Sequence, residues 1–179
     1  MTNGSFGVKF VAAKSRVAPL KELSMPRLEL QGAVLASRLG KSIREETRFQ
    51  FGKIVYFCDS HVVLAWIQSE SRVYEAFVSY RVGEIQANSD PSEWKYCPSK
   101  LNVAGDLTKG IQVESLSGRW FQGPEFLKLP EEYWPTDAGS PDMNKVNQER
   151  RKVSLVSTTT IREKVIDCKK YSTWKTFCV

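Results

Sequence analysis

The pattern that most restricts the fold of this chain is a short apolar run at residues 53–58, which follows a long stretch with helical spacing. β-Branched and aromatic side chains fill the run, as is typical of a strand covered on both faces. Before it, Ser24 and Pro26 open a helix that we expect to end near Glu46. Its apolar residues are predicted to share one face: Leu28, Gly32, Leu35, Leu39 and Ile43. This succession of helix and buried strand predicts an α/β fold.

Further elements are expected on both sides of this unit. Residues 7–15 alternate weakly after a turn signal and predict a strand. Apolar residues at helical spacing predict helices at 60–68 and 75–87, and a second aromatic run predicts a strand at 93–97. The sheet is therefore expected to lie against helices, with the chain entering it at residues 7–15.

The composition changes near residue 135. Residues 115–135 are rich in Trp, Phe, Gly and Pro and predict an aromatic extension that lies on the domain. Residues 136–152 hold few apolar side chains, and helical spacing resumes at 161–179. We therefore expect a globular domain at 1–135, a linker at 136–160 and a partly helical extension at 161–179.

The net charge of +6 is concentrated at the carboxyl end. Residues 141–179 carry 9 Lys and Arg against 4 Asp and Glu, whereas residues 1–140 carry 17 against 16. Such a basic extension fits contact with a polyanion such as nucleic acid, but a solvated basic helix gives the same count. The charge pattern leaves both interpretations open.

Several classes of protein are excluded or disfavoured. Uninterrupted apolar stretches are far shorter than the ~20 residues that span a bilayer, and the amino terminus lacks the pattern of a secretory signal. We therefore expect an intracellular protein, cytoplasmic or nuclear, without membrane contact. The cysteines lack the spacing of a zinc site and predict reduced structural thiols. The single histidine, His61, cannot build a histidine-rich metal site, although its place two residues after Asp59 is compatible with substrate contact.

Three carboxylates are candidates for a metal site. Asp59 follows the buried strand, where open α/β sheets place functional groups. Glu29 lies early in the preceding helix, and Asp106 lies in the loop after the second strand. Each residue taken alone also fits a structural role in helix capping or a turn. As a set, they are the oxygen ligands that a two-Mg²⁺ site requires.

Six strings in order resemble the ribonuclease H domain of BEL/Pao-type retrotransposon polyproteins, over about residues 8–135. They are Val11-Ala-Ala-Lys-Ser-Arg-Val-Ala-Pro-Leu20, Pro26-Arg-Leu-Glu-Leu-Gln-Gly-Ala-Val-Leu35, Tyr56-Phe-Cys-Asp-Ser60, Val63-Leu-Ala-Trp-Ile67, Asn102-Val-Ala-Gly-Asp-Leu-Thr-Lys-Gly110 and Trp120-Phe-Gln-Gly-Pro-Glu-Phe-Leu127. Residues 171–175 also resemble the connector that precedes the zinc-binding and integrase regions in such polyproteins.

The resemblance implies a ribonuclease H-like mixed sheet with flanking helices and hydrolysis of the RNA strand of RNA–DNA hybrids. It implies two Mg²⁺ ions, with Glu29 and Asp59 as ligands of metal and Asp106 as the holder of the second ion. Reverse transcriptase and integrase parts of the same polyprotein are the implied partners. Val103, Gly105 and an apparent gap near Thr108 depart from the family pattern at the last site.

One catalytic residue of the family has no counterpart here. The family's first strand carries a further aspartate, but no Asp or Glu precedes Glu22 in this sequence. We therefore expect a truncated domain that lacks the first two strands and is inactive alone. A non-catalytic nucleic-acid-binding or assembly remnant is the main alternative. An integrase-type core is disfavoured because its glutamate follows two aspartates, and the candidate Glu93 falls in a predicted strand.

Overall fold

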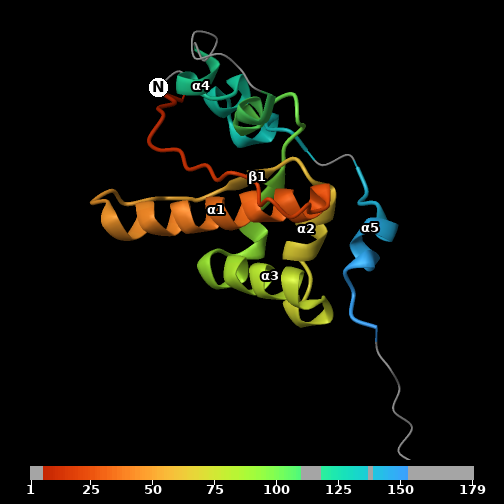
Figure 1. Ribbon diagram of the computed structural model, residues 1–179. Coiled ribbons are helices and arrows are strands. Elements are labelled where there is room, and N and C mark those ends of the chain that lie inside the picture. Colours follow the sequence, from red (N-terminus) through yellow and green to blue (C-terminus); the bar gives the residue numbers. More distant parts are fainter. Residues whose placement is uncertain (1–5, 110–117, 137–138, 153–179) are drawn as a thin grey trace, which may run out of the picture.

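The computed structural model describes residues 6–109, 118–136 and 139–152 (Figure 1). The fold is mixed α/β, mostly helical, with one small parallel sheet. Its helices and strands are α1 (Met25–Glu46), β1 (Tyr56–Cys58), α2 (His61–Ile67), α3 (Ala76–Asn88), β2 (Trp94–Tyr96), α4 (Arg119–Gln122) and α5 (Met143–Gln148). Short 3₁₀ turns join them: η1 (Ser71–Val73), η2 (Pro91–Glu93), η3 (Val103–Lys109), η5 (Glu125–Lys128) and η6 (Glu131–Tyr133).

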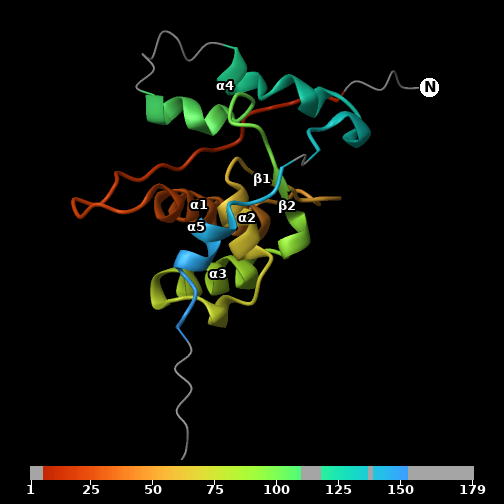
Figure 2. The same ribbon diagram turned by 90° about the vertical axis from the view of Figure 1, so that its right-hand side faces the viewer.

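The sheet consists of β1 and β2, which run parallel and side by side (Figure 2). The strand positions predicted from the sequence are confirmed, although each strand is only three residues long. Parallel strands need a long crossover, and here α2, η1 and α3 supply it. The amide of Cys97 donates to the carbonyl of Cys58 at 2.9 Å, so pairing extends just past the carboxyl ends of the strands.

The core lies between the sheet and three helices. Helix α1 packs against α3 and also contacts β1, and α2 contacts both of these helices and both strands (Figure 1). On the sheet, Tyr56 stacks on Trp94 with the ring centroids 4.7 Å apart. The buried apolar residues of the helices are Leu30, Ala33, Val34, Val62, Val63, Leu64, Trp66, Ile67, Val78, Val82 and Ile85.

Helix α1 has nearly the predicted bounds, but the face that it buries differs from the prediction. The structure buries Leu30, Ala33, Val34 and Ser37, whereas Gly32 of the predicted face is exposed. Ala33 and Ser37 are small, and Ser37 is also polar. A prediction from hydrophobicity alone therefore places the larger leucines of the predicted face in the core instead. Small side chains let α1 approach its neighbours closely, and the Ser37 hydroxyl is satisfied by the carbonyl of Val34 at 2.9 Å.

The strand predicted at residues 7–15 is absent from the structure. Residues 6–24, which lead into α1, are assigned to no strand and are mostly exposed. Their described backbone contacts include a bond from the amide of Phe6 to the carbonyl of Lys128 at 3.2 Å. An alternating pattern forms a strand only where a neighbouring strand accepts it. Among the described residues, β1 pairs with β2 alone and offers its other edge to no strand.

A short helix lies inside the segment predicted as a linker at 136–160. Residues 143–148 form α5, which begins at Asp142 as N-cap and packs against α2. Val146 is buried, and its carbonyl accepts a hydrogen bond from the indole of Trp66 at 3.3 Å. One apolar side chain is enough to anchor so short a helix, because its charged neighbours also find partners. The extension predicted at 161–179 lies outside the described residues.

The aromatic extension packs on the outer face of the sheet. Phe57, Phe126 and Trp134 meet edge to face, with ring centroids 5.3 to 6.2 Å apart. Glu131 accepts hydrogen bonds from Lys53 beside β1 and from Lys95 of β2. Within the described part of the chain, every helix is too short or too polar to cross a bilayer.

Candidate functional site

Asp59 lies at the carboxyl end of β1, as predicted. The strand ends at Cys58, and Ser60 is the N-cap of α2, whose hydroxyl accepts a hydrogen bond from the amide of Val63 at 3.3 Å. Asp59 is thus fixed between a strand end and a helix start, and its side chain is partly buried. This placement directs the carboxylate toward the edge where functional groups of parallel sheets collect.

Glu29 lies beside Asp59, on α1. Burial raises the pKa of the Glu29 carboxyl, and the negative charge of Asp59 raises it further. A hydrogen bond from the Ser60 hydroxyl and the positive charge of Lys145 on α5 act in the opposite direction. The structure therefore brings two of the predicted carboxylates together, with the Ser60 hydroxyl next to Glu29.

Asp106 lies in η3 and is held by a different partner. Its carboxylate pairs with the Arg119 guanidinium of α4 at 3.4 Å and is largely buried. Burial raises the pKa of the Cys97 thiol to about 11, with the charge of Asp59 raising it and that of Arg119 lowering it. Cys97 is therefore close to both Asp59 and Arg119, which indicates that Asp106 lies at the same edge of the sheet but is turned toward Arg119.

His61 stacks on Tyr96, the last residue of β2, with the ring centroids 3.9 Å apart. Its imidazole also approaches Gly139, where a side-chain carbon would come within 2.7 Å of Nε2. The ring is therefore packed between the sheet end and the segment that leads to α5.

Sequence reasoning missed three residues of this region. Ser60 carries an N-cap signal, because it is a serine directly before a segment with helical spacing. Arg119 and Lys145 reach the site from segments predicted to be an extension and a linker, and nothing in the local pattern distinguishes them from other surface cations.

These donors do not fit a two-ion Mg²⁺ site. Such a site needs several carboxylates around both ions. In the part of the chain that the structure describes, no three His, Cys, Asp or Glu side chains form a group that could hold a metal ion. Glu29 and Asp59 alone are close together, and the charge of Asp106 is already balanced by Arg119.

One family model matches the part of the chain that contains these two carboxylates. Residues 1–60 match the Pao retrotransposon-like RNaseH-like domain. The matched segment contains both Glu29 and Asp59 and ends at the N-cap of α2, so Asp106 lies outside it. No curated protein and no solved structure gives a significant match to the chain.

Proposed function

We propose that residues 1–135 are part of a ribonuclease H-like domain of an intracellular BEL/Pao-type polyprotein. The family activity is Mg²⁺-dependent hydrolysis of the RNA strand of RNA–DNA hybrids, and this chain is inactive alone. The observation that carries the proposal is the pairing of Glu29 with Asp59 at the carboxyl end of β1, inside the segment that matches the family. The other parts of such a polyprotein, reverse transcriptase and integrase, are the proposed partners.

The residues of this chain have separable tasks in the proposed site. Asp59 and Glu29 supply negative charge at the strand end, and Ser60 orients Glu29 through its hydroxyl. Arg119 holds Asp106 in its present position. The pKa of Glu29 is raised mainly because the carboxyl is buried, and the negative charge of Asp59 adds to the effect.

The proposed inactivity follows from the edge of β1 that pairs with no strand among the residues that the structure describes. In the family that the chain resembles, the first strand carries an aspartate that completes the site. A strand that paired with this edge would place such an aspartate beside Asp59, and it would also satisfy the backbone groups of β1. The same added segment should therefore complete both the sheet and the site.

The test compares the 179-residue chain with a chain extended at its amino terminus by two strands that carry an aspartate. Cleavage of a fluorescent RNA–DNA hybrid is measured with Mg²⁺ present. We expect background cleavage from the short chain and clear cleavage from the extended one. Asp59→Asn should reduce the cleavage by the extended chain roughly 100-fold or more.

Asp90→Asn is the matched control. It removes the same charge from the opposite end of β2, and asparagine caps a turn as well as aspartate does. The extended chain with Asp90→Asn should cleave the hybrid as fast as the extended chain without it. Asp59-dependent cleavage by the short chain would refute the proposed inactivity, and an extended chain that folds but never cleaves would refute the hydrolytic function.

The second candidate is a non-catalytic nucleic-acid-binding or assembly module. The pairing of Asp106 with Arg119 favours it, because a carboxylate neutralised by arginine is a poor metal ligand. Binding of the hybrid without cleavage, by both the short and the extended chain, would identify this function.

A further inference from the structure

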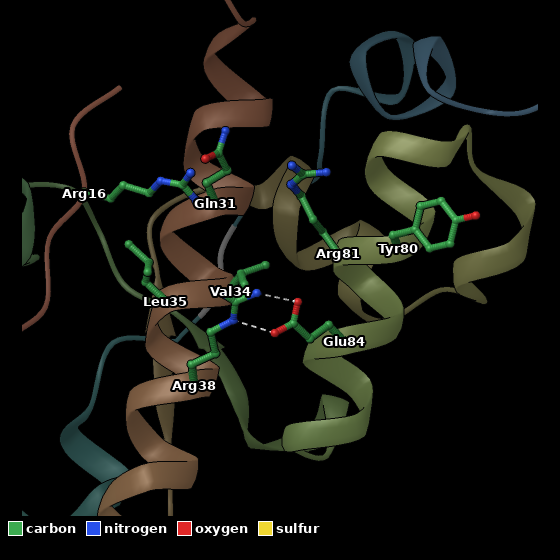
Figure 3. Close-up of a pocket in the computed structure, with 8 residues that line it drawn as sticks. All are labelled: Arg16, Gln31, Val34, Leu35, Arg38, Tyr80, Arg81 and Glu84. Atoms are coloured by element: carbon green, nitrogen blue, oxygen red, sulfur yellow. Dashed lines mark hydrogen bonds and ion pairs between the residues drawn. The ribbon is translucent and has the colours of Figure 1, made fainter. Parts of the chain in front are cut away.

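A second charged region lies on the far side of α1 from the carboxylates. A pocket of about 220 Å³ opens between α1 and α3 and is also lined by the segment that precedes α1 (Figure 3). With about 100° per residue, Arg38 lies roughly 180° around the helix from Glu29. An ion in this pocket therefore cannot also touch Glu29 or Asp59.

The carboxylates near this pocket are already paired. Arg38 forms a bidentate pair with Glu84, at 2.5 and 2.9 Å (Figure 3). Arg27 forms a second bidentate pair with Glu149, at 2.6 and 2.9 Å. These two pairs leave the positive charge of neighbouring arginines without a matching carboxylate.

Arg81 carries one of these charges. Its guanidinium stacks on the ring of Phe77 at 3.5 Å, and Nη1 donates to the Phe77 carbonyl at 2.9 Å. In the described residues, neither Nε nor Nη2 donates to a protein acceptor, and no carboxylate forms an ion pair with Arg81. Desolvation lowers the pKa of Arg81, and the charges of Arg16 and Arg27 lower it further. The negative charge of Glu84 raises the pKa of Arg81, and the positive charge of Arg38 lowers it. The group is thus fixed in place and partly desolvated, and positive charges outnumber negative ones around it.

Arg16 and Gln31 face the same space. The guanidinium of Arg16 reaches toward α1 and lies next to the side-chain amide of Gln31, while Arg81 extends from α3 on the other side (Figure 3). Tyr80 points away from the gap. The polar lining of the hollow also includes Arg38 and Glu84, which neutralise each other in their ion pair. The guanidinium groups of Arg16 and Arg81 and the amide of Gln31 therefore remain to bind a ligand, in a hollow several times larger than the ~30 Å³ that one water occupies in the liquid.

We propose that this pocket binds a phosphate group, held by Arg16 and Arg81 with Gln31 as a further donor. Guanidinium groups match phosphate oxygens in a two-pronged geometry, and a dianion would relieve the repulsion among the arginines. The phosphate belongs either to free inorganic phosphate or to the backbone of a nucleic acid. In the second case the chain has a contact for its substrate that is independent of the carboxylates.

The test measures binding of inorganic phosphate to the full chain by calorimetry, at constant ionic strength. Arg81→Gln and Arg16→Gln should each weaken binding about tenfold. Arg81→Lys should weaken it less, because lysine keeps the positive charge but cannot donate two parallel hydrogen bonds as a guanidinium does. Arg72→Gln is the control, since this exposed arginine is paired with Glu70 outside the pocket. It should change the affinity less than twofold. Arg16 lies in an exposed segment, so its replacement leaves the core intact even if Arg81→Gln disturbs the α1–α3 packing.

A labelled RNA–DNA hybrid distinguishes the two sources of phosphate. If the pocket takes backbone phosphate, Arg16→Gln and Arg81→Gln should each lower the slope of log affinity against log salt by about 1. If the pocket takes free phosphate, both variants should bind inorganic phosphate more weakly than the wild-type chain but bind the hybrid with the same affinity. Absence of phosphate binding by the wild-type chain, or an equal loss in Arg72→Gln, would overturn the proposal. Glu29→Gln should bind phosphate normally, so failure of the hydrolytic function leaves this result unaffected.

Discussion

The two faces of the sheet are covered by different kinds of packing. On the inner face, Tyr56 and Cys58 of β1 point toward the helices and are almost fully buried. On the outer face, Phe57 meets Phe126 and Trp134 of the aromatic extension, and Phe57 and Trp134 remain partly exposed. The inner face gains stability from apolar area removed from water, whereas the outer face relies on a few ring contacts and the two lysines bound to Glu131.

This difference bears on function, because the candidate carboxylates lie at the end of the sheet where the two kinds of packing meet. Asp59 and Glu29 are positioned by the inner elements β1, α1 and α2, whereas Arg119 comes from the outer segment. The inner half of the site should therefore keep its geometry when the outer segment is disturbed.

The largest expected effect compares one tryptophan from each side. Trp66 is 1% exposed, so Trp66→Ala should lower the free energy of unfolding by about 3–5 kcal/mol. Trp134→Ala removes a half-buried ring and should cost about 1–2 kcal/mol. Urea denaturation followed by circular dichroism measures both. Equal losses would show that the outer face belongs to the same cooperative core.

A smaller effect concerns two glycines of α1. A Cβ at position 40 would lie 2.3 Å from the hydroxyl oxygen of Tyr56, whereas nothing lies within 4 Å of one at position 32. Gly40→Ala should therefore cost about 1–3 kcal/mol, and Gly32→Ala should stabilise the helix by up to about 1 kcal/mol.

Tyr56→Phe sharpens the glycine comparison. The Tyr56 hydroxyl is buried without a hydrogen-bond partner, and its removal takes away the nearest clashing atom. In the background of Tyr56→Phe, Gly40→Ala should cost measurably less in the same urea titrations. An unchanged cost would mean that α1 does not approach the inner face of the sheet at this point.

The smallest effect is a pH dependence at the site. The pKa of Glu29 is raised in the folded state, so its charged form opposes folding above that pKa, and the penalty disappears as the pH falls below the unfolded value. Glu29→Gln should therefore stabilise the folded chain at pH 7 and raise its melting temperature. The gain in the free energy of unfolding should be less than about 1 kcal/mol, because solvent screens this half-exposed group. The gain should shrink toward pH 4. Glu22→Gln, in an exposed segment, is the control for loss of a carboxylate. A gain that does not vary with pH would contradict the assignment.

The elements with a strong local period could be predicted from the sequence, and so could the part of the site that they position. Helix α1 and the position of Asp59 follow from hydrophobic spacing and from the residue that ends a buried run. The prediction of a strand at 7–15 was wrong because a strand needs a neighbouring strand to pair with, and the described residues supply none.

The remaining features depend on contacts between residues far apart in the sequence. The sequence around Glu149 does not predict its ion pair with Arg27. The sequence around Arg119 likewise does not predict its ion pair with Asp106. Helix α5 was missed for the same reason, since Val146 is its one buried apolar residue and its other partners lie on α1 and α2. Charge pairs of this kind carry no periodic signal.

The position of α5 in the chain also has a kinetic consequence. Arg27 and Glu149 are 122 residues apart in the chain, so closing this contact costs more entropy before the intervening elements have folded than after. Docking of α5 should therefore follow the rate-limiting step of folding. Changes at this contact would then act on the unfolding rate and leave the folding rate nearly unchanged. In this way the last described helix should control how long the folded domain survives, while α1, α2 and α3 control how fast it forms.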